Sequence, residues 1–108
     1  MIAAREAVKP GMTAAEVDTV ARKVIQDAGY GEYFIHGTGH GMGIGVHEEP
    51  SLRFDSDLVL QEGMVFSLEP AIFVPGIVGF RHSDTIVLTK CGSKLLTEYP
   101  RELEDFLL

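Results

Sequence analysis

A stretch rich in histidine and glycine is the part of the sequence best suited to chemistry. It covers residues 36–50, reads HGTGHGMGIGVHEEP, and holds His36, His40 and His47. Imidazole carries protons near neutral pH and is a common metal ligand. Glycine at every second position from 37 to 45 lets the backbone approach a ligand or a neighbouring strand closely, at an entropic cost that a simple linker has no reason to concentrate here. The stretch is therefore the first candidate for a functional site.

Two other interpretations of this stretch fail on residue types. A phosphate-binding Gly-x-Gly-x-x-Gly pattern would need glycine where Met42 or Ile44 stands, and no Lys-Ser/Thr pair follows. His36 and His40 have the spacing of the helical zinc motif, but Gly37 stands where that motif has glutamate, and so many glycines disfavour a helix. Any metal bound here is therefore reached from a strand or a loop.

A second motif lies downstream and carries Glu69 and Arg81. Residues 60–70 read LQEGMVFSLEP, and Gly79-Phe80-Arg81 follows. Glu69 ends an apolar run, where an unpaired carboxylate would cost several kcal/mol, so we expect it to be a metal ligand or an ion-pair partner. Taken by itself, Arg81 is an ordinary ion-pair former.

The elements that must position these residues begin with a helix over residues 13–29. Thr13 and Glu16 have the spacing of a capping box, and Gly29 is a suitable C-terminal stop. Residues 1–8 are predicted to be the end of an earlier helix. The apolar face of the longer helix is predicted to comprise Val17, Val20, Ala21, Val24, Ile25 and Ala28.

The rest of the chain is predicted to consist of strands. After a polar loop over 50–57, strands are expected at 64–68, 71–74, 79–89 and 94–97, with turns at Pro75-Gly76 and Cys91-Gly92. A helix followed by antiparallel strands indicates an α+β fold. At 108 residues and 45% hydrophobic content, residues 1–108 form one domain or a piece of one.

Composition excludes several classes of partner. Sixteen acidic against nine basic residues give a net charge of −7, which disfavours nucleic acid and anionic membrane surfaces. Cys91 is the single cysteine, so no intrachain disulfide forms and a reducing cytoplasm is expected. No signal peptide and no apolar run of membrane-spanning length is visible.

Taken in order, the motifs resemble a known family. His-x-x-Gly-His-x-x-Gly-x-x-x-His-Glu, then residues 60–70 and Gly79-Phe80-Arg81, look like the second half of the "pita-bread" catalytic domain of proline-specific metallopeptidases, the aminopeptidase P and prolidase family. The match runs from about residue 9 to residue 97. The resemblance implies helices packed on a curved, mainly antiparallel sheet.

The resemblance also implies an activity and a set of site residues. The family hydrolyses the bond preceding proline in peptides with proline at the second position, using one or two divalent ions such as manganese, cobalt or zinc. By similarity, His40 and Glu69 are metal ligands, and Glu69 and His47 take part in catalysis. His36, His47 and Arg81 correspond to residues that bind substrate. For His36 and His47 alone, a hydrogen-bonded loop histidine is an equally good interpretation.

Two departures from the family pattern bear on activity. The aspartates that bridge the family's metal ions come from the first half of the domain, which these residues do not contain. Typical members have Arg-x-Glu-Asp, with the glutamate as a ligand, where this chain has Arg81-His82-Ser83-Asp84. Along a strand, alternation places Ser83 on the side of Arg81 and Asp84 on the other. A dinuclear site should therefore be weakened.

Two expectations follow from these departures, and two alternative functions remain. The isolated chain should be inactive. It should also self-associate as a homo-oligomer, through the face that a missing half would cover. The alternatives to a peptidase are a non-catalytic peptide-binding pseudoenzyme and a metal-free, creatinase-like amidinohydrolase.

Overall fold

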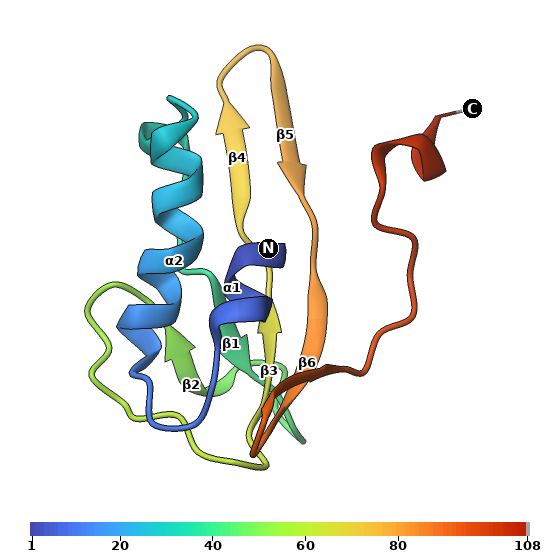
Figure 1. Ribbon diagram of the computed structural model, residues 1–108. Coiled ribbons are helices and arrows are strands. Elements are labelled where there is room, and N and C mark those ends of the chain that lie inside the picture. Colours follow the sequence, from blue (N-terminus) through green and yellow to red (C-terminus); the bar gives the residue numbers. More distant parts are fainter. Residues whose placement is uncertain (108) are drawn as a thin grey trace.

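Two helices cover one face of a five-stranded antiparallel sheet, from which a two-stranded ribbon extends (Figure 1). The computed structural model describes residues 1–107. The larger sheet has the order β2-β1-β3-β6-β7, and β4 pairs with β5 in the ribbon. The elements are α1 (Ile2–Ala7), α2 (Ala14–Asp27), η1 (Gly31–Tyr33), β1 (Gly39–Gly41), β2 (Glu48–Leu52), β3 (Val65–Leu68), β4 (Ala71–Val74), β5 (Val78–Arg81), β6 (Asp84–Thr89), β7 (Gly92–Leu95) and η2 (Leu103–Phe106).

Helix α2 begins and ends where the sequence predicts. Thr13 and Glu16 form both hydrogen bonds of the capping box, and Gly29 has a φ of +85° directly after the helix. The capping box satisfies two backbone N–H donors at the helix start and stabilises the helix by about 1 kcal/mol. In the described part of the chain, neither α2 nor any other helix combines the length and apolarity needed to cross a bilayer.

The predicted apolar face of α2 is correct only in its first half. Ala14, Val17 and Ala21 are buried, but Val24 is 54% exposed and Ala28 is exposed. Figure 1 shows why: α2 continues past the ends of β1 and β2, so its last turns have no strand of the larger sheet beneath them.

The strand predictions need one main correction. The predicted strand 79–89 is two strands, β5 and β6, separated by His82 and Ser83. Smaller differences are that the last strand is Gly92–Leu95 rather than 94–97, and that the expected loop at 50–57 begins inside β2. The split arises because the chain leaves the ribbon and joins the larger sheet between Arg81 and Asp84.

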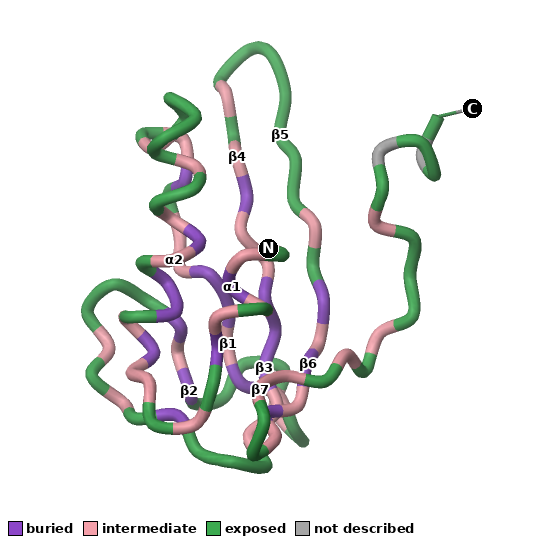
Figure 2. Tube along the Cα trace, in the orientation of Figure 1, coloured by how far each residue is buried: buried purple, intermediate pink, exposed green. Residues whose placement is uncertain are grey.

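The core lies between the helices and the larger sheet, where Figure 2 shows the buried segments, whereas most of the β4–β5 ribbon is exposed. Alternate residues of β6 are buried, as expected for a strand with one covered face. The buried core residues are Ala4, Val8, Ala14, Val17, Ala21, Leu52, Leu60, Phe66, Leu68, Ile86 and Leu88.

Asp84 ties the C-terminal segment to the start of β6. Its carboxylate is buried and accepts two hydrogen bonds from Arg101, at 2.9 Å each, and one from Thr97 at 2.6 Å. Burial alone would raise the pKa of the Asp84 carboxyl, but the hydrogen bonds from Arg101 and Thr97 outweigh burial and lower that pKa below its usual value of 3.8. The ionised form therefore stabilises the fold.

We predict that this tether makes stability depend on acid pH. Because the pKa of Asp84 is lower in the folded than in the unfolded chain, its contribution is complete above about pH 4 to 5 and is lost as pH falls through the folded pKa. Asp84→Asn should lower the midpoint of urea unfolding at pH 7. Below pH 5, the midpoint of this variant should fall less steeply with pH than that of wild type. Asp27→Asn, which removes the exposed pair with Lys23, is the control and should change neither. Equal acid sensitivity of wild type and Asp84→Asn would contradict this role.

Candidate metal centre

The site lies where the larger sheet gives way to the ribbon. The residues between β3 and β4 face the residues between β5 and β6, so Glu69 lies beside Ser83. Neither strand pair can slip by one residue without turning its side chains to the opposite face. Two cross-strand pairs flank the junction: Leu68 with Asp84, and Ala71 with Arg81.

His40 is held between two strands that approach it very closely. A Cβ atom on Gly39 would overlap the carbonyl oxygen of Ser67 in β3, and one on Gly41 would overlap the carbonyl oxygen of Glu49 in β2. Only glycine permits this approach, as the alternating glycines predicted. Ser67 Oγ also accepts a hydrogen bond from the His40 amide at 3.0 Å and donates one to the His40 carbonyl at 3.3 Å. The position of His40 is therefore fixed from both sides.

The imidazole of His40 is oriented towards the Glu69 carboxylate. His40 Nδ1 lies 2.9 Å from the Gly41 carbonyl oxygen, which can only accept, so Nδ1 carries a hydrogen. His40 Nε2 lies 3.2 Å from Glu69 Oε1. With Nδ1 protonated, Nε2 and Oε1 are two acceptors unless a proton or another cation lies with them. The two atoms are close enough to share a proton or another cation.

The separation of these two atoms fits a metal ion. Two ligands about 2.1 Å from one ion lie about 3.0 Å apart at a right angle and about 3.4 Å apart at a tetrahedral angle. The 3.2 Å between His40 Nε2 and Glu69 Oε1 falls between these values. Imidazole and carboxylate suit zinc, manganese and cobalt. Across residues 1–107 no third histidine, cysteine or acid completes a metal-binding cluster with His40 and Glu69.

The other oxygen of Glu69 has different neighbours. Ser83 Oγ donates to Glu69 Oε2 at 3.3 Å, and Arg81 Nη1 lies 4.0 Å from the same oxygen. Ser83 lies outside β5 and β6, so strand alternation does not apply to it, yet its hydroxyl faces Glu69 as expected and Asp84 points away. A neutral hydroxyl and a guanidinium therefore occupy this side of Glu69.

All five site residues singled out in the sequence line one hollow of about 280 Å³. The rings of His40 and His47 lie 4.2 Å apart between centroids. His36 donates from Nδ1 to the Gly37 carbonyl at 2.6 Å, and its buried Nε2 has no hydrogen-bond partner. We call the hollow of about 280 Å³ the histidine hollow. It is lined by His36, Gly37, Gly39, His40, His47, Ser51, Arg53, Glu69 and Arg81.

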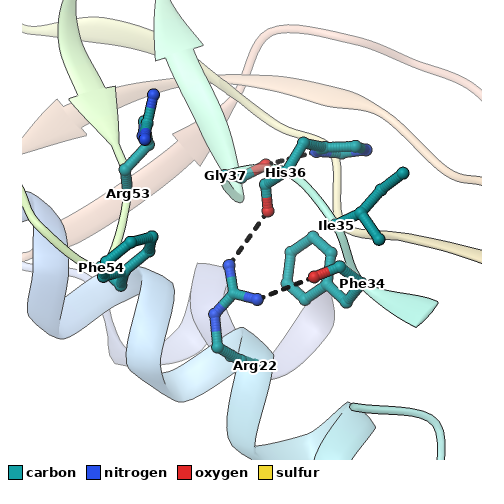
Figure 3. Close-up of a pocket in the computed structure, with 7 residues that line it drawn as sticks. All are labelled: Arg22, Phe34, Ile35, His36, Gly37, Arg53 and Phe54. Carbon is teal, nitrogen blue, oxygen red and sulfur yellow. Dashed lines mark hydrogen bonds between the residues drawn. The ribbon is translucent and has the colours of Figure 1, made fainter. Parts of the chain in front are cut away.

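Sequence reasoning missed three polar residues near the site. Arg53 lines the histidine hollow and also an adjoining hollow of about 340 Å³, which Figure 3 shows. Arg22 of α2 lines the adjoining hollow and forms a buried ion pair with Asp18. The i, i+4 spacing of Asp18 and Arg22 was visible in the sequence, but nothing there indicated that Asp18 is buried in the otherwise apolar face of α2.

Comparison with known proteins places this geometry in a family. An Xaa-Pro dipeptidase from Lactobacillus delbrueckii subsp. lactis is 59% identical over 102 residues, covering 94% of this chain and 28% of that protein. The structure of an Xaa-Pro dipeptidase from Bacillus anthracis superposes with a TM-score of 0.93 at 45% identity, covering 94% of this chain and 29% of the other. The prolidase from Pyrococcus horikoshii OT3 has a TM-score of 0.90 at 53% identity, covering 93% and 29%.

The model of metallopeptidase family M24 matches residues 1–90, and the chain belongs to this family. The α+β half-domain of the pita-bread type predicted from the sequence is confirmed by the close superposition on the two peptidase structures. The chain spans about 28% of the length of curated Xaa-Pro dipeptidases that it is similar to.

Proposed function

We propose that this chain is the C-terminal part, residues 1–108, of the catalytic domain of a cytoplasmic Xaa-Pro dipeptidase or aminopeptidase. The observation that carries the proposal is the convergence of His40 Nε2 and Glu69 Oε1, 3.2 Å apart, at the wall of the histidine hollow. Xaa-Pro dipeptidases among the relatives support the substrate, a peptide with proline at the second position. The exposed free thiol of Cys91 agrees with a reducing compartment.

Each residue of the histidine hollow has a proposed role. His40 and Glu69 hold a divalent ion of manganese, cobalt or zinc, whose chemistry when bound is to acidify water and polarise a carbonyl group. Glu69 also accepts a proton during the reaction. Its carboxylate lines the hollow, where it can reach a bound substrate or water. His47, beside His40, donates a hydrogen bond to the substrate as the bond breaks. Together these groups would bind and orient a peptide.

Two further residues are proposed to bind the ends of the substrate. Arg81 is half exposed, with its guanidinium 4.0 Å from Glu69 Oε2, so it can pair with a substrate carboxylate or hold Glu69 in place. His36 has a buried Nε2 atom without a partner, which a substrate carbonyl or carboxylate would satisfy. A buried polar atom left unpaired in the described chain is the feature expected of a binding group.

We predict that the 108-residue chain alone has no appreciable peptidase activity. Two donors do not enclose an ion firmly enough to activate water, and the remaining carboxylates are proposed to come from the preceding part of the full-length protein. Purified chain should release no proline from Gly-Pro or Met-Pro. The full-length protein, assayed with added Mn²⁺, is the control. Robust cleavage by the isolated chain would contradict the assignment of the missing ligands.

The isolated chain is also proposed to self-associate. Ile2, Val24 and Phe80 are 46%, 54% and 60% exposed and border one hollow of about 430 Å³. Exposed apolar groups of this kind favour association. Sedimentation at high concentration checks this, and a monodisperse monomer would contradict it.

A further prediction distinguishes the proposed metal ligand His40 from the proposed substrate-contacting residue His47 in the full-length protein. His40→Ala should lose bound metal and activity together, because a ligand sets metal affinity. His47→Ala should keep its metal but lose turnover by about 10²-fold to 10³-fold, as expected for a group that stabilises the transition state. Elemental analysis and steady-state kinetics on both variants test this division. Equal loss of metal in the two variants would overturn it.

The hydrogen bond from Ser83 to Glu69 favours a second candidate function. It gives Glu69 Oε2 a neutral partner where the family pattern has an acidic ligand, and Arg81 adds a positive charge nearby. Such a site would hold one ion weakly or none. A peptide-binding pseudoenzyme, or a metal-free enzyme acting on a small guanidino compound, is therefore the alternative.

Ser83→Glu in the full-length protein decides between these functions. If Ser83 replaces a lost ligand, the new carboxylate should raise metal content towards two ions per chain and give a Mn²⁺-dependent rise in melting temperature. If the site is metal-free, the new carboxylate should repel Glu69, take up no metal and lower the melting temperature. Ser56→Glu, outside the histidine hollow, is the control for an added negative charge. We expect metal uptake.

A further inference from the structure

We propose that Asp18 and Arg22 of helix α2 are positioning residues for His40 and Glu69. Neither side chain is hydrogen-bonded or ion-paired directly to the proposed metal ligands His40 and Glu69. They act through the backbone of residues 34–38, which lies between α2 and the site. The inference rests on the proposed function only in calling His40 and Glu69 metal ligands.

Asp18 and Arg22 form a buried, two-point ion pair. Arg22 Nε lies 2.9 Å from Asp18 Oδ2, and Arg22 Nη2 lies 3.2 Å from Asp18 Oδ1. The Asp18 side chain is fully buried, and that of Arg22 is 20% exposed. The planar guanidinium matches the carboxylate at two points, so both side chains have a fixed orientation.

Arg22 uses its remaining donors on the segment that leads to His40. Nη1 donates to the Phe34 carbonyl at 2.9 Å, and Nη2 donates to the His36 carbonyl at 3.0 Å. Figure 3 shows both bonds, with the guanidinium beneath the segment that carries His36. The guanidinium carbon also lies 4.3 Å from the centre of the Phe34 ring. One side chain therefore sets the path of the backbone on both sides of Ile35.

Asp18 continues the connection to Glu69. Its Oδ1 accepts from the Thr38 amide at 2.9 Å and from the Thr38 hydroxyl at 2.8 Å. The Thr38 carbonyl in turn accepts from the Glu69 amide at 2.6 Å. Thr38 directly precedes β1, and His40 follows it by two residues. Both proposed ligands are thus anchored to Thr38, and Thr38 is anchored to Asp18.

Stability alone does not explain this arrangement. A buried ion pair between a helix and a sheet is often no more stabilising than apolar side chains of the same volume. The face of α2 is otherwise apolar, and alanine or valine flanks Asp18 in the core. An apolar pair would serve packing equally well, but it would leave the carbonyls of Phe34 and His36 without donors and the Thr38 hydroxyl without an acceptor. The polar pair is needed for the position of residues 34–38.

Arg22→Lys in the full-length protein tests the inference. Lysine retains the charge for Asp18, so the protein should fold, but a single ammonium cannot donate to Asp18 and to two carbonyls with the same geometry. We expect Mn²⁺ affinity, measured by titration calorimetry, to fall about 10-fold to 100-fold, the usual effect of losing a group that orients a metal ligand. Lys23→Arg, the same kind of exchange in the exposed pair next to Arg22, is the control and should bind Mn²⁺ as wild type does.

Hydrogen exchange provides a second reading that does not depend on metal. In Arg22→Lys, the amides of Thr38 and Glu69 should exchange at least 10-fold faster relative to the Leu88 amide, which reports on the core of the larger sheet. A general loss of stability would speed all three amides alike. Asp18→Asn keeps an acceptor for Thr38 but loses the charge. Its Thr38 and Glu69 amides should exchange at rates between those of wild type and of Arg22→Lys.

The outcomes separate the two proposals. Unchanged relative exchange in Arg22→Lys, or Mn²⁺ affinity within twofold of wild type, would overturn the positioning role. If the wild-type protein takes up no Mn²⁺, the proposed metal function fails, and the exchange pattern alone then decides whether Asp18 and Arg22 fix the positions of His40 and Glu69.

Discussion

The site depends on how closely β1 lies against β2 and β3. At Gly39 and Gly41, on either side of His40, there is no room for a Cβ atom. Any other residue at these positions would push β1 away from its neighbouring strands. This proximity lets Ser67 of β3 bond to the His40 backbone and brings His40 beside Glu69, which directly follows β3. A wider separation would part the two proposed ligands, because each is attached to a different strand.

The two oxygens of the Glu69 carboxylate face groups of different charge. One oxygen faces an imidazole whose ring orientation is set by the Gly41 carbonyl, and the other faces the Ser83 hydroxyl and the Arg81 guanidinium. The two sides therefore differ in charge and in donor type. Such asymmetry supports the proposal of one cation on the His40 side.

Buried ion pairs support the histidine hollow from two directions. Asp18 and Arg22 lie beneath the segment that precedes His40, and Asp84, which directly follows Ser83, pairs with Arg101. In both pairs the arginine also donates to backbone carbonyls, at Phe34 and His36 in the first and at Thr97 and Tyr99 in the second. Each pair therefore anchors a segment that lies outside the strands, residues 34–38 to α2 and residues 97–101 to β6.

The local pattern of the sequence was sufficient for the helix start, the turns and the α+β fold, and it singled out the five residues that line the histidine hollow. Thr13, Glu16 and Gly29 act within one or two helical turns, and the spacing of His36, His40 and His47 is a property of one short segment, so such signals can be read along the chain. Tertiary structure decided what depends on distant partners. Val24 is exposed because the sheet ends beneath it, and the chain breaks its strand at His82 and Ser83 because it passes from ribbon to sheet there. Asp18 gained its role only by meeting Thr38, twenty residues away, since burial and long-range hydrogen bonds are set by packing that no local pattern encodes.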